Sequence, residues 1–123
     1  MSEDFDPIYQ EYILDLYRHP LNAGVLSGPD AEAEDVNPSC GDQIRVMVRL
    51  DGGVIAEIKH SGVGCAISQA AVSLVTQHVK GKSRADVLAM SGDDAVKLLN
   101  IPISHTRLKC ATLGLRVLQK SLL

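Results

Sequence analysis

The clearest hydrophobic pattern in the chain is an alternation over residues 43–50, where Ile44, Val46, Val48 and Leu50 occupy every second position. A period of two is typical of a half-buried β-strand. The following Asp-Gly-Gly, residues 51–53, predicts a tight hairpin turn because glycine readily takes positive φ angles. Residues 54–59 alternate again as the returning strand, and we interpret residues 61–64 as a third short strand. The pattern therefore predicts a small antiparallel sheet.

Helical spacing of apolar residues is found on both sides of this predicted sheet. One predicted helix runs from Pro7, with Asp6 as N-cap, to about Arg18, and another from Cys65 to Gly81. Two further helices are predicted after Ser83 and after Ser91, and a last one from about Ser104 to Lys120. Residues 20–39 are rich in glycine, proline and acidic side chains, and we interpret them as a long loop. The order of elements predicts an α+β fold, with a three-stranded antiparallel sheet and about five helices.

Composition narrows the functional classes. The 123 residues are 46% hydrophobic but only 3% aromatic, and the formal net charge is -3, which argues against a protein that binds nucleic acid through stacking and a basic groove. No apolar run reaches the roughly 18 residues of a membrane span. The N-terminus lacks the features of a signal peptide, and an odd number of cysteines favours reduced thiols. We therefore expect one domain, residues 1–123, in the cytoplasm, with neither nucleic acid nor membrane as a partner.

The candidate chemistry lies in three widely spaced cysteines, Cys40, Cys65 and Cys110, together with Asp42. Three sulfurs and one carboxylate oxygen supply the four ligands that tetrahedral zinc or a cluster iron takes. Free cysteines are also often small buried hydrophobes, and that alternative applies to Cys65 and Cys110. It suits Cys40 poorly, because residues 37–42, Asn-Pro-Ser-Cys-Gly-Asp, form a polar turn.

The local context of each thiol favours its ionised form. Cys65 is expected at a helix N-terminus, where the helix dipole stabilises a thiolate. Cys110 follows Arg107 and Lys109, whose charges favour a thiolate if they lie near it. On the last predicted helix, Cys110 belongs to a stripe beside the main apolar face, so we expect it at an edge of the core. Among the histidines, His105 is a reserve ligand because it shares a segment with Cys110.

Distinct motifs occur along the chain at residues 17–24 (Tyr-Arg-His-Pro-Leu-Asn-Ala-Gly), 37–42, 62–68 (Gly-Val-Gly-Cys-Ala-Ile-Ser), 76–82 (Thr-Gln-His-Val-Lys-Gly-Lys) and 107–113 (Arg-Leu-Lys-Cys-Ala-Thr-Leu). Together they resemble the motifs of the U-type iron–sulfur cluster assembly proteins, the family that contains IscU, SufU and the N-terminal domain of NifU. The resemblance extends from Tyr9 to about Leu118. The resemblance implies an α+β fold and a metal site made by Cys40, Asp42, Cys65 and Cys110.

Features of two branches of this family occur together in the chain. IscU has a histidine directly before the third cysteine and a preceding Leu-Pro-Pro-Val-Lys element, whereas this chain has Lys109 and, at residues 101–105, Ile-Pro-Ile-Ser-His. Residues 107–113 instead resemble SufU. SufU normally carries an insertion before this segment, however, and the connection from Cys65 to Cys110 has the length found in IscU. The branch therefore stays open.

The resemblance implies two main functions. The first is a scaffold, not itself an enzyme, that accepts sulfur from a cysteine desulfurase of the IscS or SufS type, binds iron and transfers a [2Fe-2S] cluster to acceptor apo-proteins. Cys110 is the first candidate sulfur acceptor and Cys40 the second, with Arg107 and Lys109 as modulating residues. The alternative is a SufU-like zinc-dependent sulfurtransferase that works with the desulfurase. A third hypothesis is a structural zinc module, against which Asp42 argues because such sites prefer Cys and His. In each case the isolated protein is expected to carry Zn2+.

Overall fold

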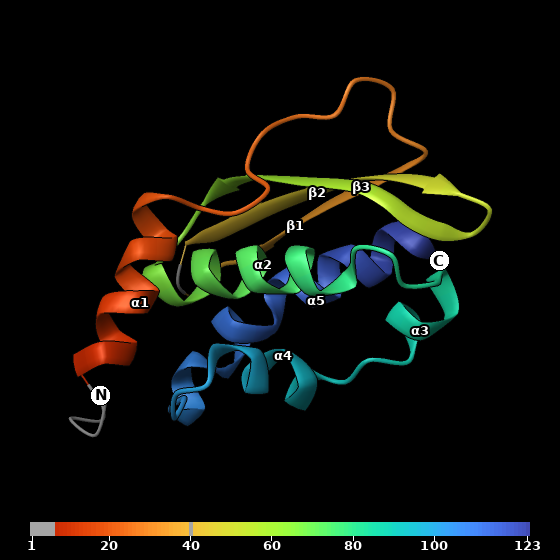
Figure 1. Ribbon diagram of the computed structural model, residues 1–123. Coiled ribbons are helices and arrows are strands. Elements are labelled where there is room, and N and C mark those ends of the chain that lie inside the picture. The colour runs from red at the N-terminus through yellow and green to blue at the C-terminus, as the bar shows by residue number, and fades with distance from the viewer. Residues whose placement is uncertain (1–6, 40) are drawn as a thin grey trace.

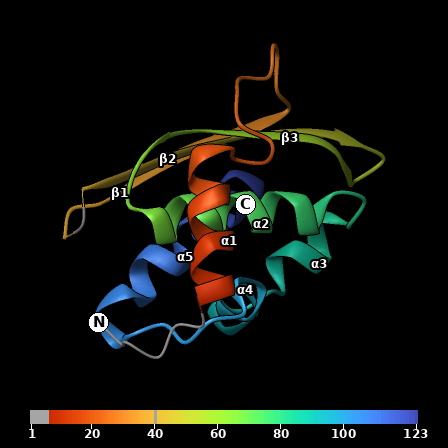
Figure 2. The same cartoon turned by 60° about the vertical axis from the view of Figure 1, so that its left-hand side comes forward.

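The computed structural model describes residues 7–39 and 41–123, and the α-helices of this part of the chain lie on one side of a three-stranded sheet (Figures 1 and 2). The elements are α1 (Pro7–Arg18), β1 (Ala31–Asn37), β2 (Asp42–Asp51), β3 (Val54–Val63), α2 (Ala66–Val79), α3 (Arg84–Leu88), α4 (Gly92–Leu99), the 3₁₀-helix η1 (His105–Arg107) and α5 (Leu108–Leu122). The predicted α+β fold is confirmed. The predicted N-cap Asp6 lies outside the described residues.

The sheet has the order β1-β2-β3 and both strand pairs are antiparallel. The predicted hairpin of β2 and β3 is confirmed, and both turn glycines, Gly52 and Gly53, have positive φ angles of 61° and 80°. The position predicted for the third strand is wrong. Residues 61–63 extend β3, and the third strand is β1, in the stretch that we interpreted as a loop.

β1 gives a weak sequence signal because its inward-facing residues are small. Ala31 and Ala33 are half-buried and alternate with the exposed Glu32 and Glu34. The strand lies at an edge of the sheet, where charged outward-facing side chains are common because they discourage pairing with other chains. Alanine and acidic residues have low β-propensity, so tertiary pairing with β2 determines this strand.

The main core lies between the sheet and the helix pair α2 and α5 (Figure 1). Ile44, Val46 and Val48 of β2 are fully buried against these helices, and each such side chain contributes about 1.5–3 kcal/mol through removal from water. α5 packs very closely on α2 at Gly114, where a Cβ would lie 2.8 Å from the Cβ of Val72. α3 and α4 form a further layer below this pair.

Serine caps fix the starts of the two short helices that the sequence predicts after Ser83 and after Ser91. Ser83 Oγ accepts a hydrogen bond from the Asp86 N–H at 3.1 Å, and Ser91 forms a reciprocal capping box with Asp94. Such caps stabilise a helix by satisfying N–H groups of its first turn. Of the helices that the structure describes, none is long and apolar enough to cross a membrane.

The segment between α1 and β1 crosses the outer face of the sheet and is attached to β3 through His60 (Figure 1). The ring Nε2–H of His60 donates to the carbonyl oxygen of Leu21 at 2.8 Å, and the His60 N–H donates to the carbonyl of Asn22 at 2.9 Å. The side chain is only 2% exposed. Burial lowers the pKa of His60, the hydrogen bond to Leu21 acts in the opposite direction, and Lys59 lowers the pKa further. His60 is therefore a buried neutral anchor for this segment.

Candidate metal centre

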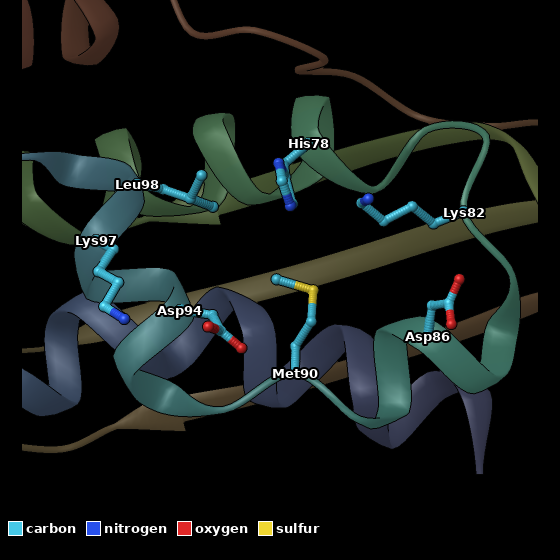
Figure 3. A pocket seen from close by; sticks show the side chains of 7 residues that line it. All are labelled: His78, Lys82, Asp86, Met90, Asp94, Lys97 and Leu98. Carbon is cyan, nitrogen blue, oxygen red and sulfur yellow. The ribbon is translucent and has the colours of Figure 1, made fainter.

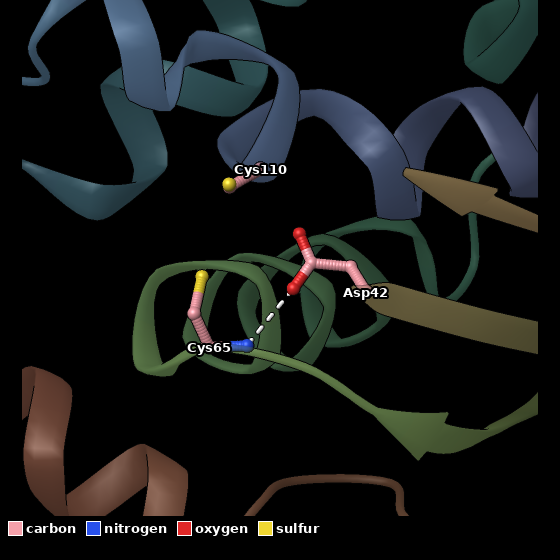
Figure 4. A group of neighbouring side chains, drawn as sticks. All are labelled: Asp42, Cys65 and Cys110. Carbon is pink, nitrogen blue, oxygen red and sulfur yellow. Dashed lines mark hydrogen bonds between the residues drawn. The ribbon is translucent and has the colours of Figure 1, made fainter. Parts of the chain in front are cut away.

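Asp42, Cys65 and Cys110 converge at one end of the sheet (Figure 4). Asp42 is the first residue of β2, Cys65 directly precedes α2, and Cys110 lies in the first turn of α5. One carboxylate oxygen and the two sulfur atoms all lie within 4.8 Å of one another. Two sulfurs bound to one tetrahedral zinc are about 3.7 Å apart, as follows from Zn–S bonds of about 2.3 Å. Small side-chain movements would thus bring these atoms to ligand distance.

The fourth predicted ligand, Cys40, lies outside the described residues. The residues that flank its turn are well placed, because Asn37 and Asp42 are paired at the last position of the β1–β2 register. Gly41, directly before Asp42, has a φ angle of 70°, a left-handed conformation that glycine adopts readily. Only residues 38–41 separate the two strands, so the segment that contains Cys40 directly adjoins Asp42.

The two carboxylate oxygens of Asp42 have different surroundings. Oδ1 accepts hydrogen bonds from the Cys65 N–H at 2.9 Å and from the Ser68 hydroxyl at 3.2 Å. Oδ2 is buried and has no hydrogen-bond partner among the described residues. Leaving a buried acceptor unsatisfied costs about 1–3 kcal/mol, and more when it is charged. A metal cation at the convergence point would satisfy this oxygen, so the residues present fit a metal.

The Cys110 side chain is completely buried, at the end of the sheet where the three residues converge. α5 packs against β1 and β2 on one side and against α2 and α4 on the other. The stripe that contains Cys110 is therefore as buried as the main apolar face of the helix. The Nδ2 of Asn37 donates a hydrogen bond of 3.8 Å to the Cys110 sulfur. The thiol thus has a polar contact at the end of β1.

Cys65 is half-buried and occupies the N-cap position of α2, as predicted. Gly64, the residue before it, has little free space around it. A Cβ at Gly64 would lie 2.4 Å from the Ser68 hydroxyl oxygen and 2.7 Å from Oδ1 of Asp42, so any larger residue would displace one of these groups. Gly64 therefore leaves space for the contacts among Cys65, Ser68 and Asp42.

Arg107 supplies the positive charge of the site. The pKa of its guanidinium is raised above the ordinary value, first by the negative charge of Cys65 and also by that of Cys110, with hydrogen bonds to both sulfurs contributing and desolvation opposing. The positive charge of Arg107 therefore acts on both sulfur atoms of the described cluster. Lys109 is exposed on α5. Arg107 was predicted to act on Cys110, and its stronger interaction with Cys65 was not.

Two polar residues of the site, Ser68 and Asn37, were missed by the sequence interpretation. Ser68 is a fully buried serine three residues after Cys65 in an otherwise largely apolar helix face, and that position is the signal that could have identified it. The reserve ligand His105 is exposed in η1 and is not one of the three residues of the described cluster.

A separate pocket of about 390 Å³ lies between the C-terminal end of α2 and the two short helices α3 and α4 (Figure 3). Its lining residues are His78, Lys82, Asp86, Met90, Asp94, Lys97 and Leu98. The lining combines acidic and basic side chains with the apolar Met90 and Leu98, and it contains no thiol. The pocket is therefore distinct from the cysteine cluster.

Comparison with known proteins gives consistent matches over almost the whole chain. The family model of the NifU-like N-terminal domain matches residues 8–123. The zinc-dependent sulfurtransferase SufU of Bacillus subtilis is 36% identical over 137 aligned positions, which cover 97% of this chain and 92% of SufU. The iron–sulfur cluster assembly scaffold protein IscU of Escherichia coli is 31% identical, covering 86% of this chain and 84% of IscU.

A solved structure shows the same fold. The N-terminal part of a NifU-like protein from Brucella abortus superposes with a TM-score of 0.75 at 23% identity, and the match covers 94% of this chain and 92% of that chain.

The 137 positions aligned with SufU exceed the 123 residues of this chain, so SufU contains additional residues within the matched region.

Proposed function

This chain belongs to the family of NifU-like N-terminal domains, and we propose that it acts in iron–sulfur cluster assembly as the scaffold on which a [2Fe-2S] cluster is built. The observation that carries the proposal is the convergence of two thiols on a buried carboxylate oxygen that lacks a partner among the described residues. Cys40, Asp42, Cys65 and Cys110 would hold the iron of the cluster, which is the cargo of the protein.

The donor set suits a cluster that is later passed on. Thiolates favour iron and zinc, while a single carboxylate is a harder and more exchangeable ligand. Cys40 and Asp42 adjoin one short turn between β1 and β2. Opening such a turn disturbs less packed structure than withdrawing the completely buried Cys110 from beneath the elements that cover it. We infer that release of the cluster to an acceptor apo-protein begins at this turn.

Sulfur would arrive as the terminal sulfur of a persulfide on a cysteine desulfurase. A thiolate of this chain attacks that sulfur, a new S–S bond forms here, and the desulfurase cysteine leaves as a thiolate. Cys110 is the first proposed acceptor, and Cys40 the second. Because the Cys110 side chain is completely buried, its reaction requires the segments that cover it to move. The positive charge of Arg107 would favour the attacking Cys110 thiolate.

The second candidate function is zinc-dependent sulfur transfer with the desulfurase, and Arg107 is the specific observation that favours it. Zn2+ bound by the same four residues would keep the three cysteine thiols in their thiolate form. When one ligand exchanges with the desulfurase, a released Cys65 or Cys110 thiolate would stay paired with the Arg107 guanidinium. The identity with SufU agrees with this candidate.

Two parallel assays separate these functions. The zinc-loaded protein is added to a cognate desulfurase and sulfide release is measured, and the metal-free protein is treated anaerobically with iron and sulfide while visible absorption is recorded. A scaffold gives a stable iron–sulfur chromophore and little stimulation of sulfide release. A sulfur-transfer partner gives strong stimulation and no stable chromophore, and a structural zinc module gives neither.

A further inference from the structure

We propose that Ser68, which is not itself a ligand, positions the Asp42 carboxylate so that it binds metal through Oδ2 alone. The inference rests on the proposed metal-binding function and deepens it, because it assigns the control of ligand exchange to a specific hydroxyl group. Ser68 is a positioning residue in this account. Its side chain is fully buried in the first turn of α2.

The hydrogen bonds of Asp42 carry the assignment. Each oxygen of an ionised carboxylate offers about two lone-pair positions. Oδ1 already receives two donors, the Cys65 N–H at 2.9 Å and the Ser68 hydroxyl at 3.2 Å. Oδ2 receives none from the described residues although it is buried. Oδ1 is thus saturated by protein donors, and Oδ2 is the oxygen that is available to a cation.

The orientation of the carboxylate agrees with this division. In Figure 4 the oxygen that accepts from the Cys65 N–H points toward the start of α2, and the other oxygen points toward α5 and Cys110. The Ser68 hydroxyl has one proton and two acceptors within reach, the Asp42 carboxylate at 3.2 Å and the carbonyl oxygen of Cys65 at 3.0 Å. An ionised carboxylate is the stronger acceptor, so the proton is directed to Oδ1 of Asp42 when that group is charged.

The geometry leads to a specific consequence for metal exchange. Without the Ser68 hydroxyl, only the Cys65 N–H would hold Oδ1, and the carboxylate could rotate about its Cβ–Cγ bond. Changes to groups that orient metal ligands typically weaken metal binding by about 10–100-fold. We therefore expect Ser68→Ala to release Zn2+ to a chromophoric chelator about tenfold faster than the wild-type protein.

The same helix provides a matched control. Ser73 is also a fully buried serine of α2, but its hydroxyl has no hydrogen-bond partner among the described residues. Ser73→Ala removes an equivalent atom from the same helix and should release Zn2+ at the wild-type rate. If Ser68→Ala and Ser73→Ala behaved alike, Ser68 would have no specific role at the site.

A double-variant comparison distinguishes positioning from a general structural effect. In an Asp42→Ala background there is no carboxylate to orient, so adding Ser68→Ala should leave the Zn2+ release rate unchanged. An acceleration of the same size with and without Asp42 would overturn the proposal, because Ser68 would then act through Cys65 or through the helix. A wild-type protein that binds no Zn2+ and forms no cluster would instead contradict the proposed function itself.

The visible spectrum of the Co2+-substituted protein provides a second measurement that does not depend on release rates. A carboxylate bound through one oxygen gives four-coordinate cobalt with intense d–d bands, and a carboxylate bound through both gives a five-coordinate ion with weaker bands. We expect intense bands for the wild type and for Ser73→Ala, and weaker bands for Ser68→Ala. Identical spectra for the wild type and Ser68→Ala would count against the assignment of Oδ2.

Discussion

The Cys65 N–H donates a hydrogen bond of 2.9 Å to Oδ1 of Asp42, so that two predicted ligands from different elements are joined directly. The bond connects the first residue of β2 to the residue that begins α2. A metal that binds Asp42 therefore also influences the start of the helix on which Cys65 lies. Asp42 therefore has two roles, as a possible metal ligand and as the hydrogen-bond acceptor that connects β2 to the start of α2.

Asp42 should determine how easily the cluster leaves more than whether the site exists. We expect Asp42→Ala to retain metal or cluster binding through the three thiols but to transfer its cluster to an acceptor apo-protein more slowly, because the most exchangeable ligand has been removed. Transfer is followed by the change in visible spectrum when a metal-free acceptor is added. Transfer rates equal to or faster than those of the wild type would contradict this prediction.

Gly64 should be required for the site rather than for the core. In Gly64→Ala the new methyl group would displace the Ser68 hydroxyl or the Asp42 carboxylate, which lie 2.4 Å and 2.7 Å from the Cβ position. We expect metal affinity to fall by about tenfold or more, as for other changes that misplace ligand-orienting groups. Competition with a chelator of known affinity measures this loss.

Gly114→Ala is the matched comparison, because its Cβ would lie 2.8 Å from Val72 in the core between α5 and α2. Overpacking of this kind costs about 1–3 kcal/mol of stability. Urea unfolding should therefore show a clear loss of stability for Gly114→Ala, whereas the metal affinity of the folded variant should change less than that of Gly64→Ala. The reverse order of effects on affinity would contradict the role given to Gly64.

His60 should make the fold less stable in mild acid. Burial lowers its pKa in the folded state below the ordinary value of 6.5, so the unfolded chain binds the proton more readily. The stabilisation is present above about pH 6.5 and is lost as the pH falls toward the folded pKa, with a slope of at most about 1.4 kcal/mol per pH unit. Urea unfolding between about pH 7.5 and about pH 5.5, with a chelator present, measures this slope.

His60→Gln is the control for that measurement because it removes the titrating ring. The variant should be less stable at neutral pH, since the contacts to the segment before β1 are weakened, but its stability should depend less on pH than that of the wild type. Equal pH slopes for the two proteins would show that another group is responsible.

Arg107 and Lys109 should distinguish the two proposed functions. In a sulfur-transfer partner, Arg107→Ala should lower desulfurase turnover while leaving zinc content nearly unchanged, because the charge beside Cys65 and Cys110 is removed. In a scaffold the same variant should mainly alter cluster assembly or stability. Lys109→Ala should act in the same direction with a smaller effect, since both sulfurs interact electrostatically with Arg107. Unchanged turnover and cluster assembly in Arg107→Ala would exclude a role for this charge.

The hairpin could be predicted from the sequence because its core-facing residues are large and alternate regularly. β1 could not, because Ala31 and Ala33 supply little apolar area and the alternating acidic residues resemble a loop. Its existence depends on pairing with β2, which local sequence does not reveal. The starts of the two short helices were easier to predict, because the N-caps Ser83 and Ser91 act through local hydrogen bonds to the first turn.

The site shows the same division between local and tertiary information. The N-cap position of Cys65 follows from the change of pattern after Gly64, and the structure places Cys65 near Asp42 and Cys110. Ser68 and Asn37 were not assigned from the sequence because their contacts are tertiary, with partners that lie 26 and 73 residues away. The burial of Cys110 was also hidden, because it depends on elements packing against both sides of α5.

Anaerobic reconstitution with iron and sulfide, followed by visible absorption, tests the central claim most directly. The measurement compares the wild-type protein with Cys40→Ser, Cys65→Ser and Cys110→Ser. The account predicts a stable [2Fe-2S] chromophore in the wild type that decays as an acceptor apo-protein gains it, and a weak or unstable chromophore in each variant. The absence of a stable chromophore in the wild type, together with strong stimulation of desulfurase turnover by its zinc form, would contradict the scaffold function.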